Sequence, residues 1–229
     1  MKAMILAAGR GERMRPLTDV APKPLLTVGG KPLIVWAIQR LLRAGISDLV
    51  VNISHLAHLI EAELGDGAAL GVRIRYSHEH EALETAGGIA WALPLLDNEP
   101  FLVVNSDVYS DYDFAPLAAR AGTLTRQHPA HLVLVNNPAH HPDGDFGLSA
   151  GRVTAAAPRF TFSGIGAYHP ALFADIQRGA KARLAAQLAQ PIAEGRVTGE
   201  HFQREWNDVG TPQRLAELDA KLTQQLGRA

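Results

Sequence analysis

The sequence predicts an α/β protein with a mainly parallel central sheet. Short apolar runs at residues 2–7, 48–53 and 101–105 alternate with segments whose apolar residues recur at helical spacing. Strands buried on both faces of a parallel sheet give unbroken apolar runs of this kind, and the helices between them act as right-handed crossovers. The chain has 229 residues and no Gly/Ser-rich linker, which indicates one compact domain.

The N-terminal elements follow one another as strand, helix, strand. After the strand at residues 2–7, Pro32 suits the first turn of a helix that ends at residue 44, and Gly45 stands where a C-terminal cap belongs. The same alternation then predicts a strand at 48–53, a helix near 56–64, a strand at 72–76, a helix at 87–96 and a strand at 101–105.

The pattern becomes less regular after about residue 113. It predicts a helix near 114–120, a strand at 131–135, a polar loop at 136–145, a hairpin of 147–150 with 152–155, and a strand at 161–168. We expect the remainder to be mostly helical, apart from the stretch 206–210.

Composition excludes several classes of protein. Lys and Arg number 22 against 23 Asp and Glu, so no net field attracts nucleic acid or an anionic membrane. With no Cys, the chain has no disulfide, thiolate metal site or cysteine nucleophile. The sequence contains no run of 18 apolar residues, and its N-terminal run is too short for a signal peptide. We therefore expect a cytoplasmic protein.

Ligands of open α/β sheets bind beyond the carboxyl ends of the strands. Candidate segments there are the loop at 6–18, the triplet Asn105-Ser106-Asp107, and Asp208. Small residues in the loop let backbone N–H groups approach a base and a polyphosphate, while its arginines neutralise charge. The loop is not a dinucleotide-binding turn, which needs a third glycine where Met14 stands, nor a P-loop, which ends in Gly-Lys-Ser/Thr.

Lys23 and Asp107 are the charged residues with the most unusual sequence surroundings. Prolines on both sides of Lys23 fix its backbone, which suits a cation held in place; the alternative is a surface lysine in a proline turn. Asp107 ends a buried strand, where a carboxylate suits Mg²⁺ or, alternatively, a helix N-cap. Asp111 and Asp113 are better N-cap candidates for the helix that follows.

Five motifs together carry a family resemblance. They are LAAGRGERMRPLT at 6–18, PKPLL at 22–26, ETAGG at 84–88, NSD at 105–107 and WNDVGT at 206–211. In this order they resemble the sugar-1-phosphate nucleotidyltransferases, or nucleotide-sugar pyrophosphorylases. The resemblance implies one Rossmann-like, three-layer domain over 1–229 with a mixed, mainly parallel sheet. Within it, residues 1–113 would form the nucleotide-binding part and 114–229 the sugar-binding part with the C-terminal helices.

The resemblance also implies roles for single residues. Arg13, Lys23, Asp107 and Asp208 would be catalytic, and the two aspartates would bind Mg²⁺. Without the WNDVGT match, Asp208 would be read as a turn residue. The residues expected to bind the nucleotide are Ala8, Gly9, Gly11, Glu12, Arg13, Lys23, Gly87, Gly88 and Asn105. Gly87 and Gly88 would complete the pocket for base and ribose at the start of a helix.

The sugar side is less clearly marked in the sequence. The residues expected to bind the sugar are Asp145, Gly147, Ser163 and Gly164. Gly147 is equally well explained as a strand glycine. Many relatives place a lysine of the central segment on the sugar phosphate, but this chain has none between Lys31 and Lys181. Arg159 is a candidate substitute.

The GDF and FTFSGI segments are most similar to the branch that forms UDP-N-acetylmuramate and pyrophosphate from UTP and N-acetylmuramate 1-phosphate in the recycling of cell-wall sugars. Alternatives are a mannose-1-phosphate guanylyltransferase or a glucose-1-phosphate uridylyl- or thymidylyltransferase. A further class is a non-catalytic nucleotide-binding regulatory protein. A glycosyltransferase using Asp111-Tyr112-Asp113 would leave the glycine loop unexplained. The paired histidines at 140–141 lack the spacing of a zinc site. We expect a monomer.

Overall fold

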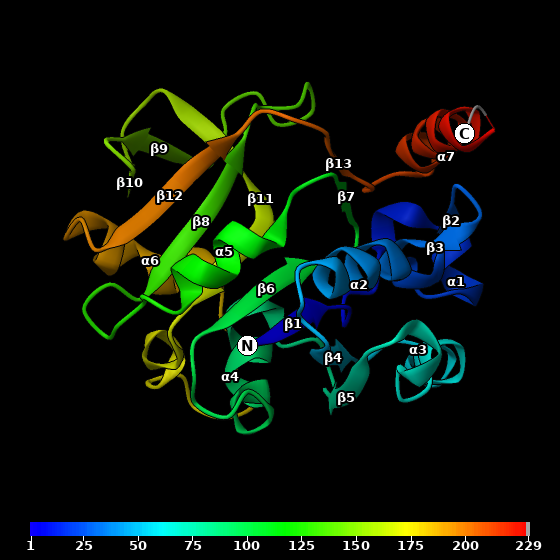
Figure 1. Cartoon of the computed structure of the whole chain (residues 1–229), viewed down its shortest axis with the longest axis horizontal. Coiled ribbons are helices and arrows are strands. Elements are labelled where there is room, and N and C mark those ends of the chain that lie inside the picture. The colour runs from blue at the N-terminus through cyan, green and yellow to red at the C-terminus, as the bar shows by residue number, and fades with distance from the viewer. Residues whose placement is uncertain (228–229) are drawn as a thin grey trace.

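The computed structural model describes residues 1–227 and shows one α/β domain (Figure 1). Its strands are β1 (Lys2–Leu6), β2 (Thr27–Val28), β3 (Lys31–Pro32), β4 (Asp48–Ile53), β5 (Arg73–His78), β6 (Phe101–Asn105), β7 (Val108–Ser110), β8 (Ala130–Val135), β9 (Phe146–Ser149), β10 (Arg152–Thr154), β11 (Arg159–Tyr168), β12 (Val197–Phe202) and β13 (Trp206–Asp208). Its α-helices are α1 (Leu17–Val20), α2 (Leu33–Arg43), α3 (Ala57–Leu64), α4 (Glu84–Ala92), α5 (Phe114–Ala121), α6 (Leu184–Ala193) and α7 (Pro212–Leu226).

Within residues 1–227, the central sheet has nine strands in the order β5-β4-β1-β6-β11-β8-β12-β10-β9. Neighbouring strands from β5 to β6 are all parallel. Strand β11 runs antiparallel to both β6 and β8, while β12 is parallel to β8. The predicted mixed sheet is thus confirmed, with its parallel part in the first half of the chain.

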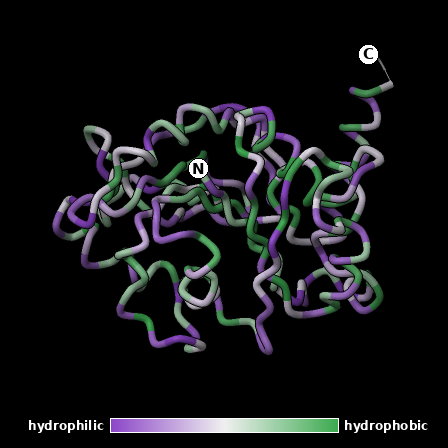
Figure 2. Tube along the Cα trace, turned by 60° about the horizontal axis from the view of Figure 1, so that its bottom comes forward, coloured by the Kyte–Doolittle hydropathy of each residue, from purple (hydrophilic) through white to green (hydrophobic). Residues whose placement is uncertain are grey.

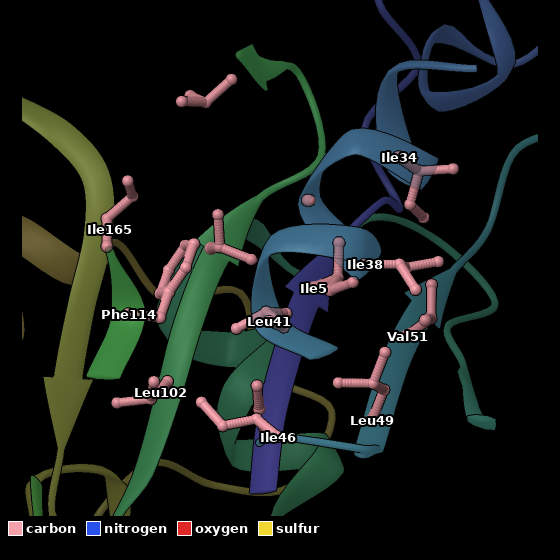
Figure 3. Close-up of a cluster of buried hydrophobic side chains, with 14 of the residues drawn as sticks. Ile5, Ile34, Ile38, Leu41, Ile46, Leu49, Val51, Leu102, Phe114 and Ile165 are labelled. Atoms are coloured by element: carbon pink, nitrogen blue, oxygen red, sulfur yellow. The ribbon is translucent and has the colours of Figure 1, made fainter. Parts of the chain in front are cut away.

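Residues alternate between the two faces of the sheet, as the pleat requires. In β1, Ala3 and Ile5 contact a core that α2, α3 and α5 cover, while Met4 contacts a second core under α4 and α6. Figure 3 shows Ile38 and Leu41 of α2 lying over Ile5. Helices therefore cover both faces of the sheet, which is the predicted three-layer arrangement.

The C-terminal helix α7 packs away from the main sheet. Leu218 and Leu222 form a third core with Val28 and Trp36, and Asp219 accepts a hydrogen bond from the backbone N–H of Gly29 at 2.8 Å. Hydrophobic and hydrophilic residues alternate along this terminal segment in Figure 2, as expected for a helix with one buried stripe. This packing ties α7 to residues 28–36.

The prediction of mostly helical structure after residue 168 was wrong for β12, residues Val197–Phe202. Its apolar pattern is weak because Gly199 and Glu200 interrupt it. The strand forms nonetheless because it inserts between β8 and β10, where both neighbours supply backbone partners. Helix α4 also begins at Glu84, earlier than the predicted residue 87, so Gly87 and Gly88 lie inside it.

In the described part of the chain, every helix is too short or too polar to cross a membrane.

Candidate active site

A cavity of about 460 Å³ opens at the carboxyl ends of β1, β4 and β6. We call it the strand-end cavity. The residues that line it are Leu6, Ala7, Ala8, Gly9, Gly11, Glu12, Arg13, Met14, Lys23, Asn52, Glu79, Ala82, Glu84, Thr85, Asn105, Ser106, Asp107 and Gly210. The glycine loop, Lys23 and the triplet after β6 therefore meet at one place, where ligands of such sheets bind.

Two glycines of the loop serve different purposes. Gly11 has a φ of +65°, and a Cβ atom there would lie 3.0 Å from Cγ2 of Thr18 and 3.2 Å from Cβ of Lys23. The Thr18 hydroxyl donates to the Gly11 carbonyl at 2.9 Å, so the loop is held against the Lys23 segment. Among residues 1–227, no atom lies within 4 Å of a Cβ position at Gly9, which leaves open space at the cavity wall.

Lys23 forms an ion pair with Asp107 across the cavity. The short 3-10 helix Lys23–Leu25 follows the extended Pro22, which directs the lysine inward. Its side chain is only 12% exposed, so Lys23 is not a surface lysine in a turn. Asp107 lies between β6 and β7 and caps no helix, whereas Asp113 accepts from the backbone N–H of Ala115 as the N-cap of α5.

A small two-stranded sheet brings Asp208 close to Asp107. Strand β13 pairs antiparallel with β7, so that Asp208 lies opposite Val108, and the Val209 N–H donates to the Asp107 carbonyl at 2.9 Å. Both aspartates line a second space of about 330 Å³, which we call the aspartate hollow. Arg13, Asn105 and Asp107 line this hollow and the strand-end cavity alike, so the two spaces adjoin.

Asp208 has partners that the sequence did not suggest. Nη1 of Arg214 lies 2.7 Å from both carboxylate oxygens of Asp208, and Nε2 of His140 lies 3.1 Å from Oδ1. Gly210 makes room for this arrangement, because a Cβ atom there would collide with Arg214 and lie 3.4 Å from Nη2 of Arg13. Two guanidinium groups therefore lie next to the aspartate pair.

A buried amide–carboxyl pair fixes the far wall of the strand-end cavity. Oδ1 of Asn52 accepts from the Ala7 N–H at 2.8 Å, and its Nδ2 donates to Oε1 of Glu79 at 2.6 Å. The Leu83 N–H donates to Oε2 of Glu79 at 2.8 Å. Burial raises the pKa of Glu79, while the hydrogen bonds that it accepts from Leu83 and Asn52 act to lower that pKa. Sequence reasoning missed both side chains; the polar Asn52 within a buried strand was the available signal.

Gly87 and Gly88 do not line the strand-end cavity. A Cβ atom at Gly88 would lie 2.6 Å from Oε1 of Glu79, and one at Gly87 would collide with the Ala180 carbonyl. Both glycines are buried, and the structure gives them a packing role behind the cavity wall. Glu84 and Thr85 of the same motif face the cavity instead.

The sugar-side residues fall into two groups. Ser163 and Gly164 line the aspartate hollow. The Ser163 hydroxyl donates to the Val133 carbonyl at 2.7 Å, so this residue presents its backbone. Gly164 has a φ of +77°, and a Cβ atom there would lie 2.6 Å from Nδ2 of Asn105. The Trp206 indole N–H donates to the Ser163 carbonyl at 2.9 Å and joins the two segments.

Asp145 and Gly147 lie apart from this group. Asp145 accepts from the Phe162 N–H at 2.8 Å and faces a different hollow together with Arg159. A Cβ atom at Gly147 would collide with the Ala156 carbonyl, as expected for a strand glycine. Arg159 donates to the Ala155 carbonyl at 3.1 Å. The structure thus does not bring these three residues to the aspartate hollow.

The fold and the site together define a class of protein. A glycine loop, cationic side chains and two carboxylates meet at the ends of parallel strands in an open sheet, an arrangement suited to holding a nucleotide and its phosphates.

The chain belongs to the nucleotidyl transferase family, whose model matches residues 2–161. It is 52% identical over 225 residues to an N-acetylmuramate α-1-phosphate uridylyltransferase from Neisseria meningitidis serogroup B, covering 96% of this chain and 97% of that one. It is 31% identical to mannose-1-phosphate guanyltransferase beta-B of Xenopus laevis over 93% of this chain and 62% of that one. The expected membership and enzyme class are therefore confirmed.

A solved structure shows the same fold. The protein HddC from Yersinia pseudotuberculosis, complexed with GMP-PN, superposes with a TM-score of 0.80 at 18% identity, over 96% of this chain and 98% of that one.

Proposed function

We propose that this protein is a uridylyltransferase that forms UDP-N-acetylmuramate and pyrophosphate from UTP and N-acetylmuramate 1-phosphate. The observation that carries the proposal is the 52% identity to a relative of that name over nearly the full length of both chains. The adjoining strand-end cavity and aspartate hollow provide two connected spaces, one for each substrate.

The reaction is an in-line transfer at phosphorus. A phosphate oxygen of the sugar 1-phosphate forms a bond to the α-phosphorus of UTP, and the bond from that phosphorus to the bridging oxygen of the β-phosphate breaks. The electron pair leaves with pyrophosphate. Because the attacking phosphate is already anionic, no general base is required, and the protein contributes positioning and charge neutralisation.

The positions of the residues support an assignment of roles. In the proposal, Ala8 and Gly9 lie against the base, while Gly11, Glu12 and Arg13 hold the phosphates. Lys23 neutralises charge at the reacting phosphorus. Asn105 lies where the two spaces meet and touches both substrates. In the proposal, residues 1–113 form the nucleotide-binding part, and 114–229 form the sugar-binding part with the C-terminal helices.

The residues present fit a divalent metal ion. No group of three or more His, Asp or Glu side chains within residues 1–227 is arranged to hold one. Two carboxylates, Asp107 and Asp208, nevertheless line the same hollow, and Mg²⁺ takes one or two carboxylates and fills its other positions with water and phosphate oxygens. In the proposal these aspartates hold Mg²⁺, which neutralises phosphate charge when bound. Lys23 and Arg214 balance the two carboxylates in its absence.

We place the reaction in the cytoplasm, where UTP is available. We further expect a monomer to be active, because residues of one chain line both spaces.

A guanylyltransferase acting on mannose 1-phosphate is the second candidate. The 31% identity to the Xenopus laevis enzyme supports it. This chain covers only 62% of that enzyme, which counts against it. The difference in identity and coverage places it behind the uridylyltransferase.

Product analysis tests the proposal. Purified protein is incubated with UTP, N-acetylmuramate 1-phosphate and MgCl₂, and pyrophosphate and the nucleotide sugar are quantified together. We expect both in equal amounts, and neither when the sugar phosphate or the metal is omitted. Binding of UTP without pyrophosphate release would contradict the proposal and favour a non-catalytic nucleotide-binding protein.

A further inference from the structure

Residues 180–183 are hydrogen-bonded to the beginning of α4, which forms part of the wall of the strand-end cavity. The Ala182 N–H donates to the Leu83 carbonyl at 3.1 Å, and the Ala182 carbonyl accepts from the N–H groups of Ala86 and Gly87 at 2.9 and 3.1 Å. The lack of a side chain on Gly87 permits this approach, since a Cβ atom would collide with the Ala180 carbonyl. The next residue, Arg183, is therefore held at a fixed place beside the cavity.

Glu84, at the start of α4, has a backbone conformation that non-glycine residues rarely adopt. Its φ is +60°, and such strain persists only where the surroundings impose it, frequently at binding sites. Glu84 lines the strand-end cavity and also a neighbouring space of about 480 Å³, which we call the Arg183 hollow. The carboxylate of Glu84 accepts from Nε of Arg183 at 3.2 Å.

Arg183 presents its two Nη groups to the Arg183 hollow. Its side chain is 81% exposed, and only Nε donates to Glu84. Within residues 1–227, no acceptor lies in hydrogen-bonding position for its two Nη groups. These groups form the planar fork that binds a carboxylate through two parallel hydrogen bonds. Arg183 is also the one cationic side chain among the described residues lining this hollow.

The Arg183 hollow is continuous with the proposed substrate spaces. Asn105 lines it together with the strand-end cavity and the aspartate hollow, and Phe162 lines both it and the aspartate hollow. A sugar whose phosphate lies near Asp107 can therefore extend a substituent past Phe162 toward Arg183. The cations close to the aspartates, which are Arg13, Lys23 and Arg214, lie outside this hollow.

We propose that Arg183, oriented by Glu84, binds the carboxylate that distinguishes the acidic sugar substrate from its neutral counterpart. The inference rests on the proposed function. N-acetylmuramate 1-phosphate differs from N-acetylglucosamine 1-phosphate by a lactyl ether that carries one carboxylate. Arg183 thus serves as a specificity residue, with no part in the transfer at phosphorus.

The test compares both sugar phosphates in Arg183→Leu, with Arg178→Leu as the matched control. Arg178 is an exposed arginine five positions earlier that lies over the Trp91 ring and lines none of the three spaces. We expect Arg183→Leu to raise KM for N-acetylmuramate 1-phosphate by about 10- to 100-fold, the range for losing a charge-assisted hydrogen-bonded pair. KM for UTP and the rate with N-acetylglucosamine 1-phosphate stay unchanged, and Arg178→Leu behaves as wild type.

Two results would overturn the inference. One is an unchanged KM for N-acetylmuramate 1-phosphate in Arg183→Leu; the other is an equal loss with both sugars, which would indicate a structural role. Failure of the proposed function is recognised separately in the wild-type protein, as an absence of turnover with N-acetylmuramate 1-phosphate before any substitution is made.

Discussion

Lys23 and Asp107 lie 84 positions apart in the chain and form an ion pair where the strand-end cavity meets the aspartate hollow. Asp208 has an equivalent cationic partner in Arg214. The charged side chains that our proposal assigns to phosphate and metal are thus already positioned by one another. Such preorganisation favours a transfer at phosphorus, because the charged groups are already gathered at the site when metal and phosphates take the place of these ion-pair partners.

Replacement of Asp107 by Asn removes one charge and keeps the shape of the side chain. We expect kcat to fall by about 10²- to 10³-fold, the range seen when one electrostatic group of an active site is removed. Initial rates of pyrophosphate release measure the effect. Asp175→Asn, an exposed aspartate outside the strand-end cavity and the aspartate hollow, is the control. A kcat within twofold of wild type in Asp107→Asn would refute the role of Asp107.

Replacement of Lys23 by Met keeps most of the length of the side chain and removes its positive charge. We expect kcat to fall about 10²-fold or more, because the charge at the reacting phosphorus is no longer neutralised. Lys31→Met is the matched control, since Lys31 lies over the Trp36 ring and lines neither space. Equal activities of the two variants would show that Lys23 serves only to balance Asp107.

The substitutions Gly9→Ala and Gly88→Ala distinguish two roles of glycine. Gly9 leaves space for substrate, and Gly88 allows close packing within the protein. At Gly88 the added Cβ would lie 2.6 Å from Glu79, so we expect the free energy of unfolding to fall by about 1–3 kcal/mol. At Gly9 the Cβ meets no atom of residues 1–227 within 4 Å, so we expect stability to stay unchanged while KM for UTP rises. Urea unfolding and steady-state kinetics on both variants check this. A destabilised Gly9→Ala with normal KM would be the opposite result.

We expect Glu79 to make the free energy of unfolding depend on pH. Its native pKa is raised from the ordinary value of 4.5 by burial, so the native state retains a proton that the unfolded state releases. This contribution to stability is fully present below pH 4.5 and is lost as the pH rises through the native pKa. We expect the free energy of unfolding of the wild type, relative to that of Glu79→Gln, to decrease as the pH rises from 4.5 through the native pKa. Urea unfolding at several pH values tests it, with Glu63→Gln, on the exposed side of α3, as the control.

The sequence predicted the parallel part of the fold well. Strands at 48–53 and 101–105 were predicted with the observed bounds, because strands buried on both faces give unbroken apolar runs. Strand β12 was missed, since Gly199 and Glu200 interrupt its pattern and its formation depends on pairing with β8 and β10. Local sequence carries little of that tertiary contribution.

The candidate site was predictable to a different degree at each residue. Lys23, Asp107 and the glycine loop were found because each follows a strand or is set off by proline and glycine. The pairing of Arg214 with Asp208 and His140 was not predicted, because His140 lies in a loop 74 positions from Arg214. The ETAGG motif drew attention to its two glycines, whereas Glu84 and Thr85 line the cavity.

A competition experiment tests the central proposal most directly. Wild-type protein receives UTP, GTP, dTTP and CTP at equal concentrations, together with the 1-phosphates of N-acetylmuramate, N-acetylglucosamine, glucose and mannose, and the nucleotide sugars are identified by mass spectrometry. We predict UDP-N-acetylmuramate as the dominant product. Predominance of GDP-mannose or another nucleotide sugar, or the absence of any, would contradict the account.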